Sequence, residues 1–241
     1  LQEDAANLDE VVVVGYGTMD KKELTSAVSH VSSKNFTQVA SVDPSMMIQG
    51  KVAGVSITNT GAGDPNNQAS IQVRGVSSRA AGLGPLIVID GVPGGNLTNI
   101  NPNDIESYDV LKDGAASAIY GTRGSNGVIL VTTKKGARDG NLHTSYNGSI
   151  ALDVIKKDLD MLSPDEYRAN RLASGTGYDL GGSTDWMKEV SRVGVRTVHT
   201  LTLSGGNIKS NYRASVDYRD AKGIDKYSGR QEYGARISLN H

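Results

Sequence analysis

Segment 141–154 alternates apolar and polar residues over about fourteen positions, and this alternation constrains the fold more than any other feature. One face would carry Leu142, Thr144, Tyr146, Gly148, Ile150, Leu152 and Val154, and the other Asn141, His143, Ser145, Asn147, Ser149 and Asp153. A period of two belongs to a β-strand, and a strand of this length exceeds the usual five or six residues. The segment fits a tilted strand that crosses a membrane.

Three further runs of the same kind follow at 197–204, 211–219 and 233–240. Their links are unequal: 205–210 is a short turn, 220–232 is intermediate, and 155–196 is a long excursion with a capping box at Ser163-Pro164-Asp165-Glu166. Long loops at one end and tight turns at the other are typical of an outer-membrane barrel. Alternation alone leaves a soluble β-sandwich as the alternative.

Four strands cannot close a barrel around a domain, and backbone groups in hydrocarbon are satisfied only when the barrel closes. We therefore expect the barrel to continue beyond His241, and the chain to be a fragment of a longer protein that is already trimmed at its N-terminus.

A different pattern fills 85–135, where apolar runs at 86–89, 108–111 and 128–132 alternate with capped turns. Asn101-Pro102 and Asp113 are helix N-caps, and Gly121 suits a left-handed helix end. Upstream, 24–31 suggests a modest strand, Asp43-Pro44 begins a helix, and 55–59 and 70–74 read as two strands. The sequence predicts a small mixed sheet with short helices, an α+β fold.

Four valines at 11–14 stand between an acidic lead-in and Gly15-Tyr16-Gly17. They fit a buried strand, and equally an extended segment that adds to the sheet edge of a partner. The residues alone leave both interpretations open.

Several function classes are excluded by what the sequence lacks. A net charge of −1 without a basic stripe argues against nucleic acid, and no apolar run reaches the ~18 residues of a spanning helix. Cysteine is absent, and His30, His143, His199 and His241 are too scattered to predict a metal site. No GxSxG motif or phosphate-binding loop is present. We expect no enzymatic activity, no cofactor and no metal.

The segments LDEVVVVGYGT near the start and PLIVIDGVPGG with NINPNDIESYDVLKDGAASAIYGTRGSNGVILVTTKKG resemble the SusC/RagA family of TonB-dependent outer-membrane transporters of the Bacteroidetes type. The likeness covers roughly residues 8–136 and extends weakly through SPDEYRA, STDW and LTLSGGN. It implies a TonB-box region and lead-in at 1–18, a plug domain at 19–136, and the first strands and extracellular loops of a transmembrane β-barrel at 137–241.

The resemblance also implies an importer in the outer membrane of a Gram-negative cell, with a plug inside a barrel of roughly 22 strands. Its partners would be TonB, a SusD-like surface lipoprotein, outer-membrane lipid, and an oligosaccharide or peptide substrate. The role of the TonB-box falls on Asp9, Glu10, Val11, Val12, Val13, Val14, Gly15 and Tyr16. The N-terminal extension of many members and most of the barrel are missing from this sequence.

Two alternatives remain: a soluble carbohydrate-binding module with a sandwich sheet at 137–241, and a TonB-dependent siderophore or cobalamin receptor. The substrate and its contact residues stay unknown, although loops 60–68 and 77–84 are candidates to face the lumen.

Overall fold

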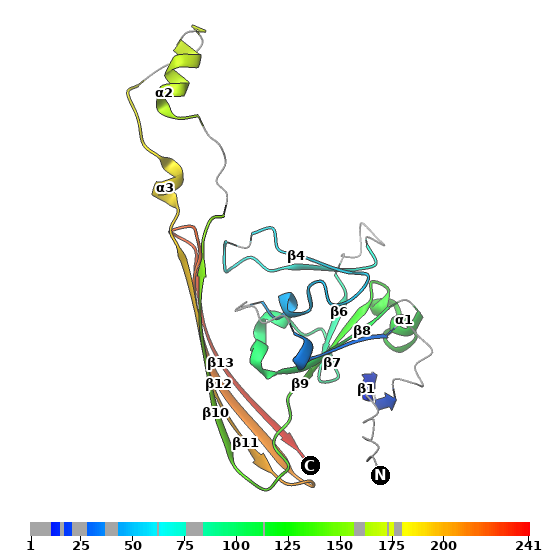
Figure 1. Cartoon of the computed structure of the whole chain (residues 1–241). Coiled ribbons are helices and arrows are strands. Elements are labelled where there is room, and N and C mark those ends of the chain that lie inside the picture. The colour runs from blue at the N-terminus through cyan, green and yellow to red at the C-terminus, as the bar shows by residue number, and fades with distance from the viewer. Residues whose placement is uncertain are drawn as a thin grey trace, which may run out of the picture.

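Two sheets that lie side by side organise the chain (Figure 1). The computed structural model describes residues 11–14, 17–20, 28–36, 43–61, 63–75, 84–112, 114–156, 162–172, 174–175 and 180–241. We call the described residues of 28–135 the α+β unit, and β10 to β13 the long-stranded sheet. The strands are β1 (Val11–Val14), β2 (Gly17–Asp20), β3 (Val28–Ser32), β4 (Val55–Thr58), β5 (Ser70–Val73), β6 (Leu86–Ile89), β7 (Val92–Pro93), β8 (Ile105–Leu111), β9 (Val128–Thr133), β10 (His143–Asp153), β11 (Gly194–Gly206), β12 (Asn211–Lys222) and β13 (Gly229–Asn240).

The helical elements are short. They are the 3-10 helices η1 (Ser33–Asn35), η2 (Pro44–Ile48), η3 (Leu97–Asn99), η4 (Pro102–Asp104) and η5 (Gly121–Gly124), the π-helix η6 (Arg168–Leu172), and the α-helices α1 (Gly114–Tyr120), α2 (Pro164–Tyr167) and α3 (Trp186–Val190). The predicted helix starts at Asp43 and Asn101 are confirmed, since each side chain accepts a backbone N–H two residues on, but they open 3-10 turns. The predicted cap Asp113 lies outside the described residues.

The α+β unit is built on a five-stranded mixed sheet of order β3-β8-β9-β6-β7. Only β6 and β9 pair in parallel within it, from Leu86 opposite Val128 to Ile89 opposite Val131. The runs at 86–89, 108–111 and 128–132 are strands as predicted, and β8 begins earlier, at Ile105. The predicted pair at 55–59 and 70–74 forms the separate antiparallel hairpin β4–β5. The α+β prediction is therefore confirmed.

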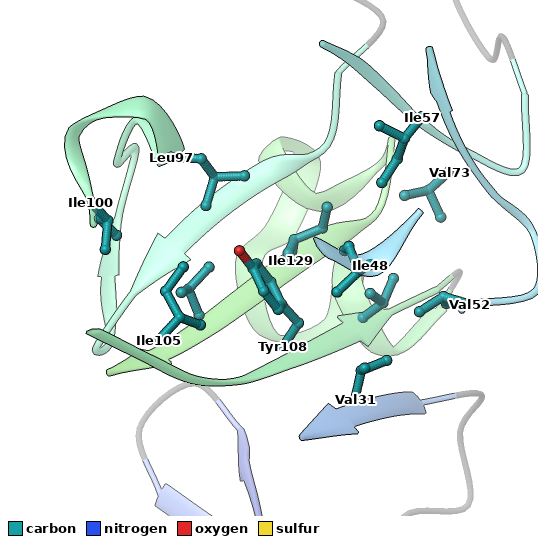
Figure 2. Close-up of a cluster of buried hydrophobic side chains, with 12 residues drawn as sticks. Val31, Ile48, Val52, Ile57, Val73, Leu97, Ile100, Ile105, Tyr108 and Ile129 are labelled. Atoms are coloured by element: carbon teal, nitrogen blue, oxygen red, sulfur yellow. The ribbon is translucent and has the colours of Figure 1, made fainter. Parts of the chain in front are cut away.

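Both faces of this mixed sheet are buried. On one face, β8 and β9 residues such as Tyr108 and Ile129 pack against η2, η3 and the β4–β5 hairpin, as Figure 2 shows. On the other face Leu111, Val128 and Leu130 pack against Ala116 of α1. Burial on both sides explains why β9 begins with the continuous apolar run VILV and does not alternate there.

Tyr108 anchors the larger core cluster. Its side chain is fully buried, its hydroxyl donates to the Pro44 carbonyl at 2.8 Å, and its ring meets Phe36 edge-on at 5.4 Å. Burial raises the pKa of Tyr108 well above its usual value, with the Asp43 charge adding to the effect. The phenol therefore remains neutral and fixes η2 to the sheet.

Gly127 is required at the turn into β9, because its φ is +87° and an added Cβ would lie 2.9 Å from Val73 Cβ. In Gly127→Ala we expect the α+β unit to be cleaved about thirtyfold faster in limited proteolysis, because a left-handed alanine and the clash together cost about 2 kcal/mol. Gly140→Ala is the matched control, since Gly140 has φ +82° with nothing within 4 Å. Equal acceleration in both variants would show that the Val73 contact contributes nothing.

The long-stranded sheet pairs β10, β11, β12 and β13 in sequence order, all antiparallel, with strands of 11 to 13 residues. The four predicted runs are confirmed, but the predicted links are too long. Strands continue to Gly206 and Lys222 and resume at Asn211 and Gly229, so the links shrink to 207–210 and 223–228. Polar residues such as Asp220 and Gln231 interrupt the alternation at the strand ends, so the pattern does not predict that the strands continue there.

The two faces of the long-stranded sheet differ in polarity. The face turned away from the α+β unit exposes large apolar side chains, at 60% or more for Tyr146, Ile150, Leu152, Val216, Tyr233, Ile237 and Leu239. Rings of Tyr146, His199, Tyr218 and Tyr233 form a row across all four strands, with neighbouring centroids 6.1, 6.5 and 4.9 Å apart. Aromatic rows of this kind flank the apolar band of strands that cross membranes.

No helix in the part of the chain that the structure describes combines the length and apolar character needed to span a bilayer.

Candidate functional site: the seam between the α+β unit and the long-stranded sheet

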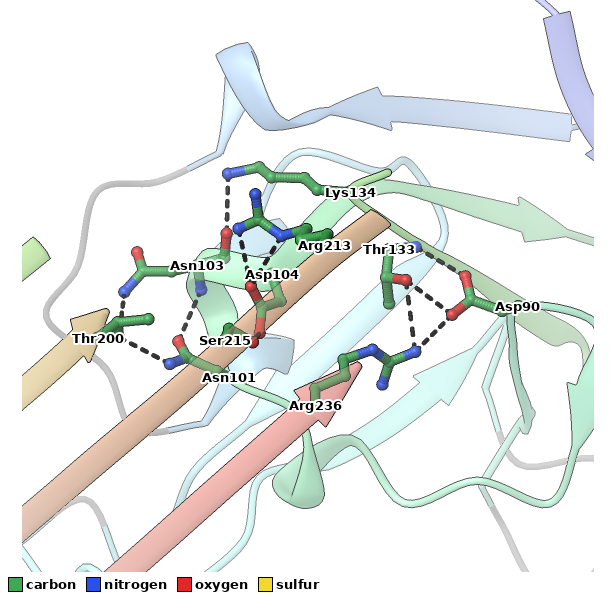
Figure 3. Close-up of polar contacts among 10 residues, drawn as sticks. All are labelled: Asp90, Asn101, Asn103, Asp104, Thr133, Lys134, Thr200, Arg213, Ser215 and Arg236. Atoms are coloured by element: carbon green, nitrogen blue, oxygen red, sulfur yellow. Dashed lines mark hydrogen bonds and ion pairs between the residues drawn. The ribbon is translucent and has the colours of Figure 1, made fainter. Parts of the chain in front are cut away.

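The contacts between the α+β unit and the inward face of the long-stranded sheet, which we call the seam, are mainly polar. Asp104 ends η4 and is 2% exposed. Its carboxylate accepts from Arg213 Nη2 at 2.9 Å and from Ser215 Oγ at 2.6 Å, both on β12 (Figure 3). A buried carboxylate is stable only when it is paired and hydrogen-bonded, and these donors satisfy that need.

Amides and a lysine extend this contact on both sides of Asp104. Asn101 and Asn103 both donate to Thr200 Oγ1 on β11, at 2.8 and 3.3 Å. Lys134 Nζ donates to the Asn103 carbonyl at 2.8 Å, and burial together with the nearby Arg213 charge lowers the pKa of Lys134. The 101–104 turn is thus held at its backbone and through its side chains.

A second carboxylate meets the sheet at Asp90, which follows β6 with an unusual positive φ of 47°. Its Oδ1 accepts the Thr133 N–H at 2.8 Å, and its Oδ2 accepts from Arg236 Nη2 on β13 at 2.6 Å. Figure 3 shows the two acids side by side along the seam. At both points the α+β unit supplies the acid and the long-stranded sheet supplies the arginine.

A third group lies on the inward face itself. Arg219, 4% exposed, donates to Asp217 Oδ2 at 3.1 Å, and its Nη1 lies 3.1 Å from Glu232 Oε2. The same Nη1 donates to the Thr98 carbonyl of η3 at 3.4 Å. Arg230 also binds Glu232. Charges of both signs are therefore neutralised within the sheet and linked to the α+β unit.

The loop between β4 and β5 reaches the link between β12 and β13. Ile224 N donates to the Gly63 carbonyl at 2.8 Å, and Ile224 O accepts from Arg192 N at 2.7 Å. Close approach requires glycine here, because a Cβ on Gly223 would lie 2.5 Å from the Gly63 carbonyl oxygen. One residue thus connects the α+β unit to the end of the excursion.

Two cavities adjoin the seam. A polar one of about 40 Å³ lies under the β4–β5 loop, between Asp43 and Thr98 of the α+β unit and Asp153, Arg196 and Arg230 of the sheet. A larger one of about 390 Å³ lies within the α+β unit, between η2, β5, β6 and η3, and includes Ile71, Ile87 and Leu97.

The predicted TonB-box is only partly described. Val11, Val12, Val13 and Val14 form β1, which pairs with β2 from Val11 opposite Asp20 to Val14 opposite Gly17. Asp9, Glu10, Gly15 and Tyr16 lie outside the described residues. Of the two candidate loops, most of 60–68 is described and lies at the seam, whereas 76–83 lies outside the described residues.

The four histidines stay apart, and no group of acids and histidines suited to a metal occurs among the described residues. His30 pairs with Asp109 at 2.5 Å inside the α+β unit, while His199 meets Tyr146 on the outward face. His143 bonds to Asp139 and, as the first cause, lowers the pKa of that carboxyl to about 2. His241 bonds to Ser210.

Sequence reasoning did not single out Asp90, Asp104, Arg213 or Arg236. The available signal was the polar side of the alternation in 211–219 and 233–240, which marks the inward face without indicating its partners. Asp104 and Arg213 are 109 positions apart, so no local pattern joins them.

Comparison with known proteins identifies the arrangement. A family model described as the TonB-dependent Receptor Plug Domain matches residues 20–128. The TonB-dependent receptor SusC of Bacteroides thetaiotaomicron is 41% identical over 99% of this chain and 25% of its own length. The TonB-dependent receptor P3 of Formosa agariphila is 38% identical over 93% of this chain and 22% of its own length. The chain thus spans about a quarter of the length of these curated relatives.

Solved structures show the same fold. The RagAB peptide importer in its open-open state aligns with a TM-score of 0.85 at 26% identity, over 95% of this chain and 30% of that chain. The siderophore receptor PirA of Pseudomonas aeruginosa aligns with a TM-score of 0.54 at 18% identity over 88% of this chain and 31% of that chain, a likeness of fold alone. These relatives are receptors and transporters of the outer membrane of Gram-negative bacteria. By its plug domain, its sequence and its fold, the chain belongs to the SusC/RagA family of TonB-dependent receptors.

Proposed function

We propose that the chain forms the plug and first wall strands of an active importer that carries glycans or peptides across the outer membrane. One observation carries this proposal: the described α+β unit bonds to the inward face of a sheet whose outward face exposes apolar side chains. Such a two-faced sheet fits a wall between lipid and a hydrated lumen, with the α+β unit as the stopper. The described site holds no catalytic constellation, and we infer that the chain performs no covalent chemistry.

We further propose the division at 1–18, 19–136 and 137–241, with residues 9–16 as the TonB-box. Four β-branched residues ahead of the plug suit addition to a sheet edge of TonB. In the structure these valines pair with β2, so binding of TonB would exchange one strand partner for another. Outer-membrane lipid would cover the outward face, and a SusD-like lipoprotein would deliver cargo from outside.

A peptide cargo is supported by the structure with a TM-score of 0.85, which is named as a peptide importer. The 41% identity to SusC supports a receptor of this family without naming a cargo. Neither a soluble carbohydrate-binding module nor a siderophore or cobalamin receptor gains comparable support. A row of exposed tyrosines on the outward face disfavours the soluble module, because water would face those rings.

The test is uptake of fluorescent oligosaccharides and peptides by cells that express the full-length receptor. We expect accumulation of at least one cargo, and a fall to background in a strain without TonB or after addition of a protonophore, while binding at the cell surface persists. Cargo accumulation that is equal with and without TonB would contradict the proposed function.

A further inference from the structure

The small cavity of the seam has the size of a single polar group. At about 40 Å³ it has room for about three water molecules or one carboxylate, since one water needs roughly 10–15 Å³. A sugar ring or a peptide backbone does not fit inside. The β4–β5 loop and η3 of the α+β unit line it together with the long-stranded sheet, so a group bound here would touch the plug and the wall together.

One hydrogen-bond donor that lines this cavity, on Arg196, has no acceptor in the part of the chain that the structure describes. Arg196 on β11 binds Asp153 Oδ1 through Nη2 at 2.6 Å, but its Nε is buried and has no hydrogen-bond partner among the described residues. A buried guanidinium N–H without an acceptor is costly, and such a group calls for a water or a ligand. Arg230, which pairs with Glu232, brings a second guanidinium to the same cavity.

The carboxylates of the cavity, by contrast, each accept at least one hydrogen bond. Asp43 accepts from Ser45 N, Ser45 Oγ and Ala69 N at 2.6 to 2.9 Å. Asp64 accepts from Asn66, and Asp153 accepts from Arg196. A buried cationic donor without an acceptor within the described ranges, beside carboxylates that already accept hydrogen bonds, favours a ligand that supplies acceptors and negative charge.

We propose that this cavity binds a carboxylate group of the transported cargo, through Arg196 Nε with Arg230 beside it. The inference rests on the proposed import function and narrows its cargo to acidic molecules. A carboxylate accepts charge-assisted hydrogen bonds from guanidinium groups and matches the available volume. Its source is either the C-terminus of a peptide or a uronic acid of a glycan.

The experiment measures binding to the purified full-length receptor by equilibrium dialysis with two pairs of probes. One pair is an N-acetylated alanine tetrapeptide and its C-terminal amide, and the other is trigalacturonic acid and its methyl ester. We expect at least one acid to bind about tenfold more tightly than its neutral counterpart. The pair that shows this preference identifies the source of the carboxylate.

The variant for this test is the double substitution Asp153→Asn with Arg196→Gln, because removing Arg196 alone would leave Asp153 partly buried and unpaired. We expect the preference for the acid to fall to about twofold or less. Arg168→Gln is the matched control, since Arg168 pairs with the exposed Asp165 on the excursion, and it should keep the full preference. Unchanged mobility on unheated gels verifies that the variants are folded.

Two outcomes would overturn the proposal. The first is that the wild-type receptor prefers neither acid, which would mean that water alone fills the cavity. The second is that the preference for an acid survives the double substitution. TonB-dependent uptake of neutral cargo together with either outcome would reject the carboxylate site alone. Absence of TonB-dependent uptake for every cargo would instead reject the import function.

Discussion

Deleting residues 9–14 from the full-length receptor should abolish energised uptake while leaving cargo binding at the cell surface largely intact. The reason is that these residues include β1, the segment proposed to pair with TonB, whereas the contacts of the seam lie elsewhere in the chain. Uptake of labelled cargo is compared with a strain that lacks TonB, and the deletion should match it.

Point substitutions sharpen this test. Val13→Pro removes a backbone donor from the segment and should reduce uptake nearly as far as the deletion. Val13→Thr keeps a β-branched residue and its N–H, and should retain uptake. Thr18→Pro is a second control, because Thr18 is opposite Val13 and its substitution disrupts the same hairpin outside the proposed donor. Normal uptake by the deletion would refute the strand-donor assignment.

Replacing Asp104 by alanine should weaken the attachment of the plug to the barrel wall more than any other single substitution considered. The change leaves Arg213 without its partner at a site where the carboxylate is 3% and the guanidinium 16% exposed. Breaking a buried pair costs about 3–5 kcal/mol, so we expect the plug of the purified receptor to be cleaved more than about a hundredfold faster. Cells should also become sensitive to vancomycin, which intact outer membranes exclude.

Asp165→Ala is the control for Asp104→Ala, because Asp165 forms an ion pair with Arg168 at 94% exposure. Exposed pairs contribute about 0–1 kcal/mol, so this variant should behave as wild type. A double-mutant cycle with Arg213→Met isolates the pair itself. If Asp104→Ala were no more labile than Asp165→Ala, the seam would not depend on this contact.

Local features of the fold were predictable from the sequence. The period of two located all four long strands, because one face is apolar and the other polar along most of their length. The caps at Asp43, Asn101 and Ser163 were also predictable, since each uses a side chain to satisfy a backbone N–H two or three residues away. Physical rules that act over a few residues leave a signal that can be read directly.

The seam was not predictable, because its contacts join residues that are far apart in the sequence and leave no local signal. Asp104 and Ser215 are 111 positions apart, and nothing local distinguishes Arg213 from other arginines on the inward face. The length of the 223–228 link was also missed, because strand ends beyond the apolar band carry polar residues on both faces. Pairing over long distances depends on how the two sheets dock, which no short pattern encodes.

Ile224 joins the plug loop to the excursion with its own peptide groups, its N–H to Gly63 and its carbonyl to Arg192. These two bonds act in series, so a load on the plug loop reaches the excursion by way of Ile224, beside the bonds of Arg192 to Gly223 and Ser228. Neither bond of Ile224 involves a side chain. The sequence at this position can therefore vary among residues that fit beside Gly63 while both bonds persist, whereas proline would remove the amide hydrogen and break the bond to Gly63.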